Sequence, residues 1–229
     1  MKKKILCLAL CFILILSCAC SKAPDNKTDA KPQEKTAELY NYEVTEEPFE
    51  SMEIRNSYAT YKTYDNEQDL FEASDMVFIG MPTDTFTDGE EHYYNVNNDE
   101  VDKESDETIF FYCTLRDIKV IEMLKGDKSL ETVSVADRAV VKEENDGSKT
   151  IIGLPTGNSI AKKNVKYVYY VKRAVPENMN FYFAAHDEGL INIDGLDSKV
   201  GRADRVLAAK ERLPEQFEKY DRSSELAVK

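Results

Sequence analysis

The chain has only two histidines for acid-base catalysis or metal binding, and neither lies in a recognisable catalytic pattern. His92 lies within an acidic stretch, and His186 is followed directly by two further acids. A Ser-His-acid triad needs one of them beside a nucleophilic serine, but the sequence contains no Gly-x-Ser-x-Gly turn. A zinc site at His186 would need another ligand from a distant segment. We therefore assign no catalytic, cofactor-binding or metal-binding residue.

Residues 84–107 are the most acidic stretch, with ten carboxylates against the single Lys103. Clustered carboxylates suit calcium, but the spaced Asp-x-Asp-x-Asp-Gly ligand loop is missing. Long insertions in compact domains are usually functional or disordered. We interpret this one as a solvated acidic insertion, with weak calcium binding as the alternative. Asp194 and Asp197 allow the same two interpretations.

The remaining reactive side chains also have structural explanations. Cys113 lies mid-strand among apolar residues, without a neighbouring cation to lower its pKa, so we expect a buried thiol. Tyr167, Tyr169 and Tyr170 could form a ligand platform on an OB-type barrel, but strand packing explains them equally well. With 43 Asp and Glu residues, some carboxylates will lie close together in any fold, so an acid pair for hydrolysis carries no information.

The N-terminus has the three parts of an export signal. Lys2, Lys3 and Lys4 are followed by an apolar run over residues 5–16 and then by Ser-Cys-Ala-Cys at residues 17–20. The apolar run is shorter than the ~20 residues that a membrane-spanning helix requires. We predict that residues 1–19 are a signal peptide.

The cysteines at the cleavage site resemble the lipobox of bacterial lipoproteins. We favour lipidation of Cys20, with Cys18 as the alternative and a secretory signal with an incidental cysteine as the third reading. Lipoprotein maturation attaches a diacylglycerol, and two acyl chains are what stable anchoring requires. We expect an extracytoplasmic protein anchored to the cell membrane. Cys113 is then the only other cysteine left, so the mature domain must rely on an apolar core instead of disulfides.

The net charge of −13 argues against nucleic acids and anionic lipid headgroups as partners. Loss of the three signal-peptide lysines makes the mature chain more acidic still. Nucleic acids and anionic lipid headgroups are bound by clustered Lys and Arg. We therefore expect no nucleic-acid partner.

The rest of the chain divides into a tether, a β-rich domain and a C-terminal helix. Residues 20–50 are polar and interrupted by prolines, which favours a flexible tether. A short helix over residues 67–73, capped by Asp65 or Asn66, opens the domain at 51–198. Residues 199–229 carry apolar side chains at spacings of three and four, with Pro214 kinking or restarting that helix. The expected strands cover residues 76–82, 108–124, 132–135, 139–142, 150–152, 165–171, 181–185 and 190–193.

Two details of the strands can be predicted. Residues 76–82 are continuously apolar, which indicates a strand buried on both faces. In residues 108–124 the apolar alternation changes parity at Arg116 and Asp117, which favours a β-bulge there. Residues 145–147 (Asn-Asp-Gly) indicate a hairpin turn, and residues 181–185 and 190–193 are expected to pair around the turn at 187–189.

Four segments resemble a family of bacterial extracytoplasmic domains that mostly lack an assigned function. They are residues 74–80 (SDMVFIG), 118–126 (IKVIEMLKG), 163–172 (KNVKYVYYVK) and 187–193 (DEGLINI). Asn164 stands where the family usually has Gly, a substitution that a left-handed turn tolerates. The family is more loosely similar to the OB-like barrel of netrin modules and tissue inhibitors of metalloproteinases. The inhibitory mechanism needs a disulfide-tethered N-terminal cysteine, which this chain lacks.

The resemblance and the strand pattern imply a mainly β fold, a small OB-like antiparallel β-barrel with a short N-terminal helix and a C-terminal amphipathic helix. We expect a membrane-anchored binding or protein-interaction module of unknown activity, with the lipid bilayer and a protein as partners. The alternatives are an extracytoplasmic hydrolase that uses carboxylates or a metal, and a calcium-responsive surface protein. The residues favour a binding module over an enzyme and imply no cofactor.

Overall fold

The computed structural model describes residues 44, 46–57, 63–155, 159–174, 179–185 and 189–223. All of them belong to one compact unit, residues 42–229. The expected signal peptide, both candidate lipidation sites at Cys18 and Cys20, most of the tether and His186 lie outside the described residues.

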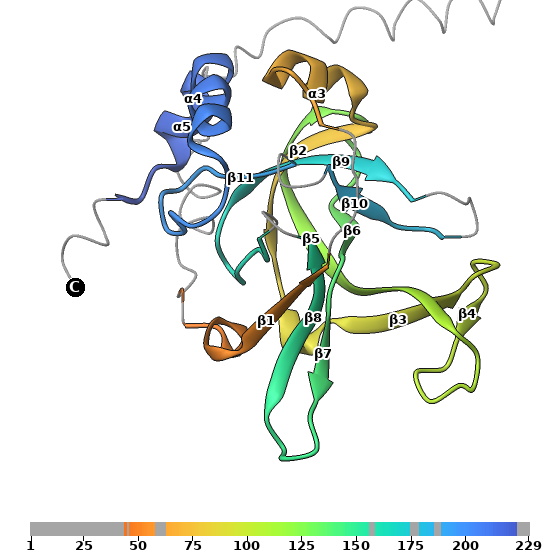
Figure 1. The fold of residues 1–229 in the computed structure, drawn as a ribbon. Helices are drawn as coiled ribbons and strands as arrows, with labels where there is room; N and C mark the ends of the chain where they lie inside the picture. The colour runs from red at the N-terminus through yellow and green to blue at the C-terminus, as the bar shows by residue number, and fades with distance from the viewer. Residues whose placement is uncertain are drawn as a thin grey trace, which may run out of the picture. The chain divides into compact units, whose positions relative to one another are not determined.

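Five strands close into a barrel, which confirms the predicted mainly β barrel fold (Figure 1). Around the ring, each strand is hydrogen-bonded to the next, and the last pairs with the first. The pair β6 and β10 is parallel and the other four pairs are antiparallel. In ring order the strands are β2 (Met76–Pro82), β5 (Ile109–Lys125), β6 (Thr132–Asp137), β10 (Tyr182–Ala184) and β9 (Tyr167–Arg173).

Strand β2 is buried along its whole length, as its continuous apolar sequence predicts. It lies between β5 and β9, and the Phe78 ring stacks on the Tyr169 ring at 5.1 Å between centroids. A Cβ atom at Gly80 would collide with Ile118 and with Phe78, so glycine allows β2 and β5 to pack this closely.

The parity change within β5 has a cause other than the predicted bulge. Its pairing with β6 is continuous from Thr114 to Lys119, so no bulge occurs at Arg116, and that prediction is wrong. Thr114, Arg116 and Ile118 are all buried, which means that a charged residue occupies an inward position of the strand. The irregularities lie elsewhere along β5: Phe110 is passed over in the pairing with β3, and Ile121 and Leu124 are passed over in the pairing with β2.

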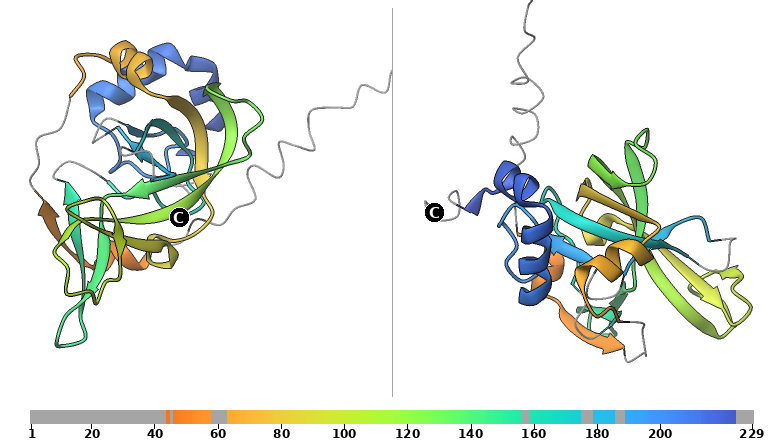
Figure 2. Two further views of the ribbon diagram at one scale, coloured as in Figure 1. Left: turned by 90° about the vertical axis from the view of Figure 1, so that its right-hand side faces the viewer. Right: turned by 90° about the horizontal axis from the view of Figure 1, so that it is seen from above.

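A second, three-stranded sheet lies beyond the barrel, at the end opposite the helices (Figures 1 and 2). Its central strand β8 (Lys149–Pro155) pairs with β7 (Val140–Glu143) through the predicted turn, where Gly147 has a φ of 80°. The outer strand β1 (Glu53–Ser57) runs parallel to β8. The 3₁₀ helix η1 (Pro48–Ser51) packs here through buried Phe49, so the end of the expected tether lies on the domain.

The helices cover one end of the barrel (Figure 2). Helix α3 (Glu67–Ala73) begins as predicted, with the Asn66 side chain accepting a hydrogen bond from the Asp69 amide at 2.9 Å. The C-terminal pattern forms two helices, α4 (Ala203–Arg212) and α5 (Pro214–Tyr220), because Pro214 restarts the helix at its first position. Most of the predicted apolar face is buried, namely Ala209, Leu213, Phe217 and Tyr220.

Strand β11 (Leu190–Asn192) does not pair with β10, which corrects the predicted final pair. Both strands pair with β9 instead, β10 opposite residues 171–173 and β11 opposite residues 167–169. They therefore continue one another along the same edge of β9. The predicted turn between them lies outside the described residues, apart from Gly189.

The acidic insertion contains regular secondary structure, and nine of its ten carboxylates are exposed, in agreement with its interpretation as a solvated insertion. It contains the 3₁₀ helix η2 (Phe86–Asp88), β3 (Glu90–Asn95) and β4 (Glu100–Val101). Strand β3 pairs with the first part of β5, and together they project from the barrel (Figure 1). We call residues 90–112 the arm. Among the described residues, no helix has the length and apolarity to cross a membrane.

Candidate functional site

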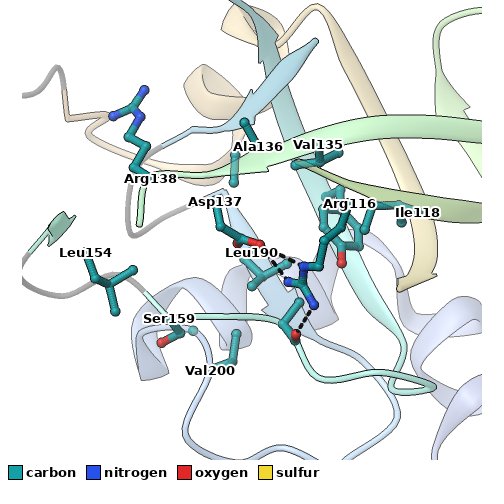
Figure 3. A pocket seen from close by; sticks show the side chains of 14 residues that line it. Arg116, Ile118, Val135, Ala136, Asp137, Arg138, Leu154, Ser159, Leu190 and Val200 are labelled. Atoms are coloured by element: carbon teal, nitrogen blue, oxygen red, sulfur yellow. Dashed lines mark hydrogen bonds and ion pairs between the residues drawn. The ribbon is translucent and has the colours of Figure 1, made fainter. Parts of the chain in front are cut away.

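A small chamber of about 30 Å³ lies among β5, β6 and β9 (Figure 3). Apolar side chains form most of its wall, and five polar or charged groups interrupt them. The apolar residues include Ile118, Val135, Leu154, Leu190 and Val200, and the polar ones are Arg116, Asp137, Arg138, Ser159 and Tyr169.

An ion pair between β5 and β6 dominates the chamber. Asp137 accepts hydrogen bonds from Arg116 Nε at 2.9 Å and Nη2 at 2.8 Å, and Arg116 Nη1 donates to the Ala161 carbonyl at 2.8 Å. The Arg116 side chain is 1% exposed. Burial opposes its charge, but the neighbouring carboxylate outweighs this and raises the pKa of Arg116. The guanidinium is therefore held charged and nearly saturated with acceptors.

The Tyr169 hydroxyl faces the same chamber and has no hydrogen-bond partner within the described part of the chain. Its side chain is buried, and burial raises the pKa of the phenol far above its usual value. A buried hydroxyl without a partner is costly, and a chamber of about 30 Å³ has room for about two water molecules. An ordered water is the group that this space and this hydroxyl fit. The volume is too small for a substrate.

A larger groove of about 790 Å³ runs between residues 192–201 and helices α4 and α5. Its walls are apolar at Ile193, Val206 and Phe217, while Lys210 and Glu218 add charges of opposite sign. Leu207, 63% exposed, is the most open apolar side chain at this groove. The size is that of a ligand cleft, and Asp197 and Asp221 also line it.

The arm is tied to the rest of the domain through Glu91. This carboxylate accepts hydrogen bonds from the Val141 amide at 2.9 Å, from the Tyr93 hydroxyl at 2.6 Å and from Lys103 Nζ at 3.1 Å. Val141 belongs to β7, so one side chain joins β3 to the second sheet. These contacts fix the direction in which the arm projects.

The inner face of the arm is aromatic. Tyr94 packs against Phe111 at 5.9 Å and Phe181 at 6.3 Å between ring centroids, and Phe183 completes the cluster. Cys113 is fully buried in this cluster, where burial raises the pKa of its thiol to about 12. The expectation of a buried structural thiol therefore agrees with its surroundings.

The apex of the arm is organised by one asparagine. Asn95 Oδ1 accepts hydrogen bonds from the amides of Asn97 and Asp99 at 2.9 and 3.0 Å, and its Nδ2 donates to Glu107 at 2.7 Å. Asn98 has a φ of 63°, which asparagine tolerates better than most residues. The turn between β3 and β4 is thus held by specific contacts.

Among the described candidate metal ligands, His92 lies beside two carboxylates. His92 Nδ1 lies 2.6 Å from Glu100, while Nε2 is 3.7 Å from Glu90. Across the described residues, no group of three or more His, Cys, Asp or Glu side chains is arranged to hold a metal ion.

The other candidate residues have structural partners. The Tyr167 hydroxyl donates to Asp197 at 2.9 Å, and the Tyr170 hydroxyl donates to Glu67 at 2.6 Å. Asp194 accepts the Lys166 amide at 2.8 Å and anchors the chain that follows β11. These tyrosines are buried and cannot form an exposed stacking platform.

Two features of the chamber and the arm escaped sequence reasoning. Arg116 and Asp137 were not singled out as a pair, although the break in the alternation of β5 marks Arg116. Phe110 lies within the predicted strand at residues 108–124, and nothing in that pattern indicates that its side chain is 70% exposed. Neither protein-family models nor curated proteins match the chain.

Proposed function

We propose that this chain is a lipid-anchored extracytoplasmic lipoprotein whose OB-like barrel domain acts as a protein-interaction module. The observation that carries the proposal is the contrast between the chamber and the arm. The chamber inside the barrel has only about 30 Å³ and its ion pair is satisfied, whereas the arm presents an ordered, projecting surface. A preorganised surface suits binding, because little ordering entropy is lost on association.

The proposed membrane attachment uses diacylglycerol on Cys20, or on Cys18. It is supported by the three-part N-terminus and by the acidic surface, which gives the domain no attraction of its own to anionic headgroups. We also propose membership of the bacterial extracytoplasmic domain family described above. The five-stranded barrel is compatible with the OB-like fold which that resemblance implies.

Lipidation is tested by the intact mass of the chain extracted from membranes with detergent. We expect a mass equal to residues 20–229 plus the diacylglyceryl group, and loss of this species in Cys20→Ala but not in Cys18→Ala. Loss in Cys18→Ala alone would reassign the anchor to Cys18. An unmodified chain in the culture medium would contradict anchoring.

Interaction is tested by quantitative capture from detergent-solubilised cells of the source bacterium. The bait is the full lipidated chain, and the control bait is residues 1–43 fused to an unrelated soluble domain. We expect one or a few proteins that are enriched only by the full chain. Equal enrichment by the two baits would contradict the proposal.

A further inference from the structure

We infer that the arm is the docking surface of the module, and that Phe110 is the anchor residue that enters an apolar pocket on a partner protein rimmed by Lys and Arg. This inference rests on the proposed function and specifies its contact surface and the chemistry of its partner.

The position of Phe110 follows from a β-bulge. Between β3 and β5 the pairing passes from Tyr94↔Phe111 directly to Asn95↔Ile109. Phe110 is therefore an extra residue without a partner in the ladder, and bulges of this kind re-aim a side chain. Its neighbour Phe111 packs inward, while Phe110 is 70% exposed.

A second apolar side chain is exposed at the same end of the arm. Val96, which directly follows Asn95 in the turn, is 67% exposed. In the described part of the chain, five large apolar side chains are between 36% and 70% exposed. Only Phe110 among them is aromatic. Exposed aromatic residues held on a rigid frame are typical anchors of protein interfaces.

The surrounding charge defines the partner. Residues 99–107, which run from just before β4 to just before β5, carry six exposed carboxylates and one lysine, Lys103, which already contacts Glu91. The six are Asp99, Glu100, Asp102, Glu104, Asp106 and Glu107. An apolar anchor framed by negative charge is complementary to an apolar pocket with a basic rim. The same charge repels anionic lipid and nucleic acid, and it disfavours a second copy of this acidic chain.

The experiment places a photo-crosslinking amino acid, p-benzoylphenylalanine, in the full lipidated chain in living cells. It replaces Phe110 in one strain, Val96 in a second and Leu207 in a third. Leu207 is the matched control, because it is an apolar side chain on helix α4 with 63% exposure. Substitution at these exposed positions leaves the core intact, which circular dichroism of each purified chain checks.

We expect a discrete protein adduct from positions 110 and 96 and none from position 207, with the crosslinked peptide of the partner containing or flanking Lys and Arg. In detergent extract, the adduct yield should fall about tenfold or more when salt is raised from low to ~0.5 M, because exposed charges are then screened. Replacing the six carboxylates by their amides should lower the yield similarly, while Phe110→Ser should reduce capture by about tenfold.

The outcomes separate this inference from the function on which it rests. Adducts from position 207 but not from 110 or 96 would overturn the docking surface and leave the interaction module standing. Adducts with lipid or nucleic acid in place of protein would overturn the stated partner chemistry. No adduct at any position, together with no protein enriched by the full chain, would remove both.

Discussion

Removing the carboxylate of Asp137 is expected to destabilise the domain strongly. In Asp137→Ala, the Arg116 guanidinium stays buried and keeps only the Ala161 carbonyl at 2.8 Å and a longer contact of 3.5 Å to the Asp84 carbonyl. Loss of one member of a buried ion pair typically costs about 3–5 kcal/mol, because an uncompensated charge remains. Since domains are stable by only about 5–15 kcal/mol, much of the free energy of unfolding would be lost.

Urea unfolding and thermal unfolding, both followed by circular dichroism on the chain without residues 1–19, measure this effect. For a domain of this size we expect the melting temperature to fall by about 6–20 °C. The double variant Arg116→Met/Asp137→Leu should be clearly more stable than the sum of its single variants predicts, because it leaves no buried charge. The exposed pair Arg202 and Asp204, 2.9 Å apart, is the matched control, and Arg202→Ala should cost less than about 1 kcal/mol.

If Asp137→Ala changes the free energy of unfolding no more than Arg202→Ala does, Asp137 does not compensate a buried charge on Arg116. Strict additivity of the two single variants would refute this compensation as well, because the two side chains would then be energetically independent.

Three further predictions concern the packing around the barrel. Hydrogen bonds from α5 lower the pKa of Glu122 despite its burial. The free energy of unfolding of Glu122→Gln at pH 7 should therefore be about 1 kcal/mol lower than that of the wild type. The stabilisation by Glu122 is present above pH ~4.5 and is lost as the pH falls through the lowered pKa of the folded state. The free energy of unfolding should therefore depend less steeply on acidic pH in the variant than in the wild type. The Cys113 thiol, with its pKa raised to about 12, should react with Ellman's reagent at pH 8 at least ~100-fold more slowly in the folded chain than in guanidinium, and equal rates would contradict its burial. Gly153→Ala should destabilise by about 1–3 kcal/mol in urea, because the new Cβ overlaps the Tyr112 ring at a positive φ. Gly147 also has a positive φ, but an added Cβ there would meet no atom within 4 Å, so Gly147→Ala should destabilise the domain less than Gly153→Ala. A larger loss of stability in Gly147→Ala would argue against the overlap with Tyr112.

Elements with strong local signals could be predicted from the sequence. Strand β2 is an unbroken apolar run, helix α3 has its capping residue at Asn66, and the β7–β8 turn has Gly147 at the position that needs a positive φ. Pro214 separates α4 from α5 for an equally local reason, because its fixed backbone suits the first turn of a helix.

Long-range contacts decided what could not be predicted. Arg116 is polar by type and would be placed outside, but Asp137 on the next strand satisfies its charge inside. The parity change that suggested a bulge was produced by this pairing. The bulge at Phe110 depends on the register that β3 imposes on β5, and the acidic sequence of β3 hides its strand character.

The order of the acidic insertion has a similar origin. Composition alone favours a solvated loop, since carboxylates repel one another. The folded chain offsets this through Asn95 at the apex and Glu91 at the base, both of which accept backbone amide hydrogen bonds. The Asn95 contacts are local, but the contact between Glu91 and the Val141 amide joins segments 50 residues apart, so the sequence of the insertion alone could not predict it.

The central claim is that this domain functions by binding a protein through the arm. The most direct test captures proteins from detergent-solubilised cells with three lipidated baits: the wild-type chain, Phe110→Ser and Leu207→Ser. We predict that wild type and Leu207→Ser enrich the same protein to the same extent and that Phe110→Ser enriches it about tenfold less. Equal enrichment by all three baits, or selective loss with Leu207→Ser, would contradict the account.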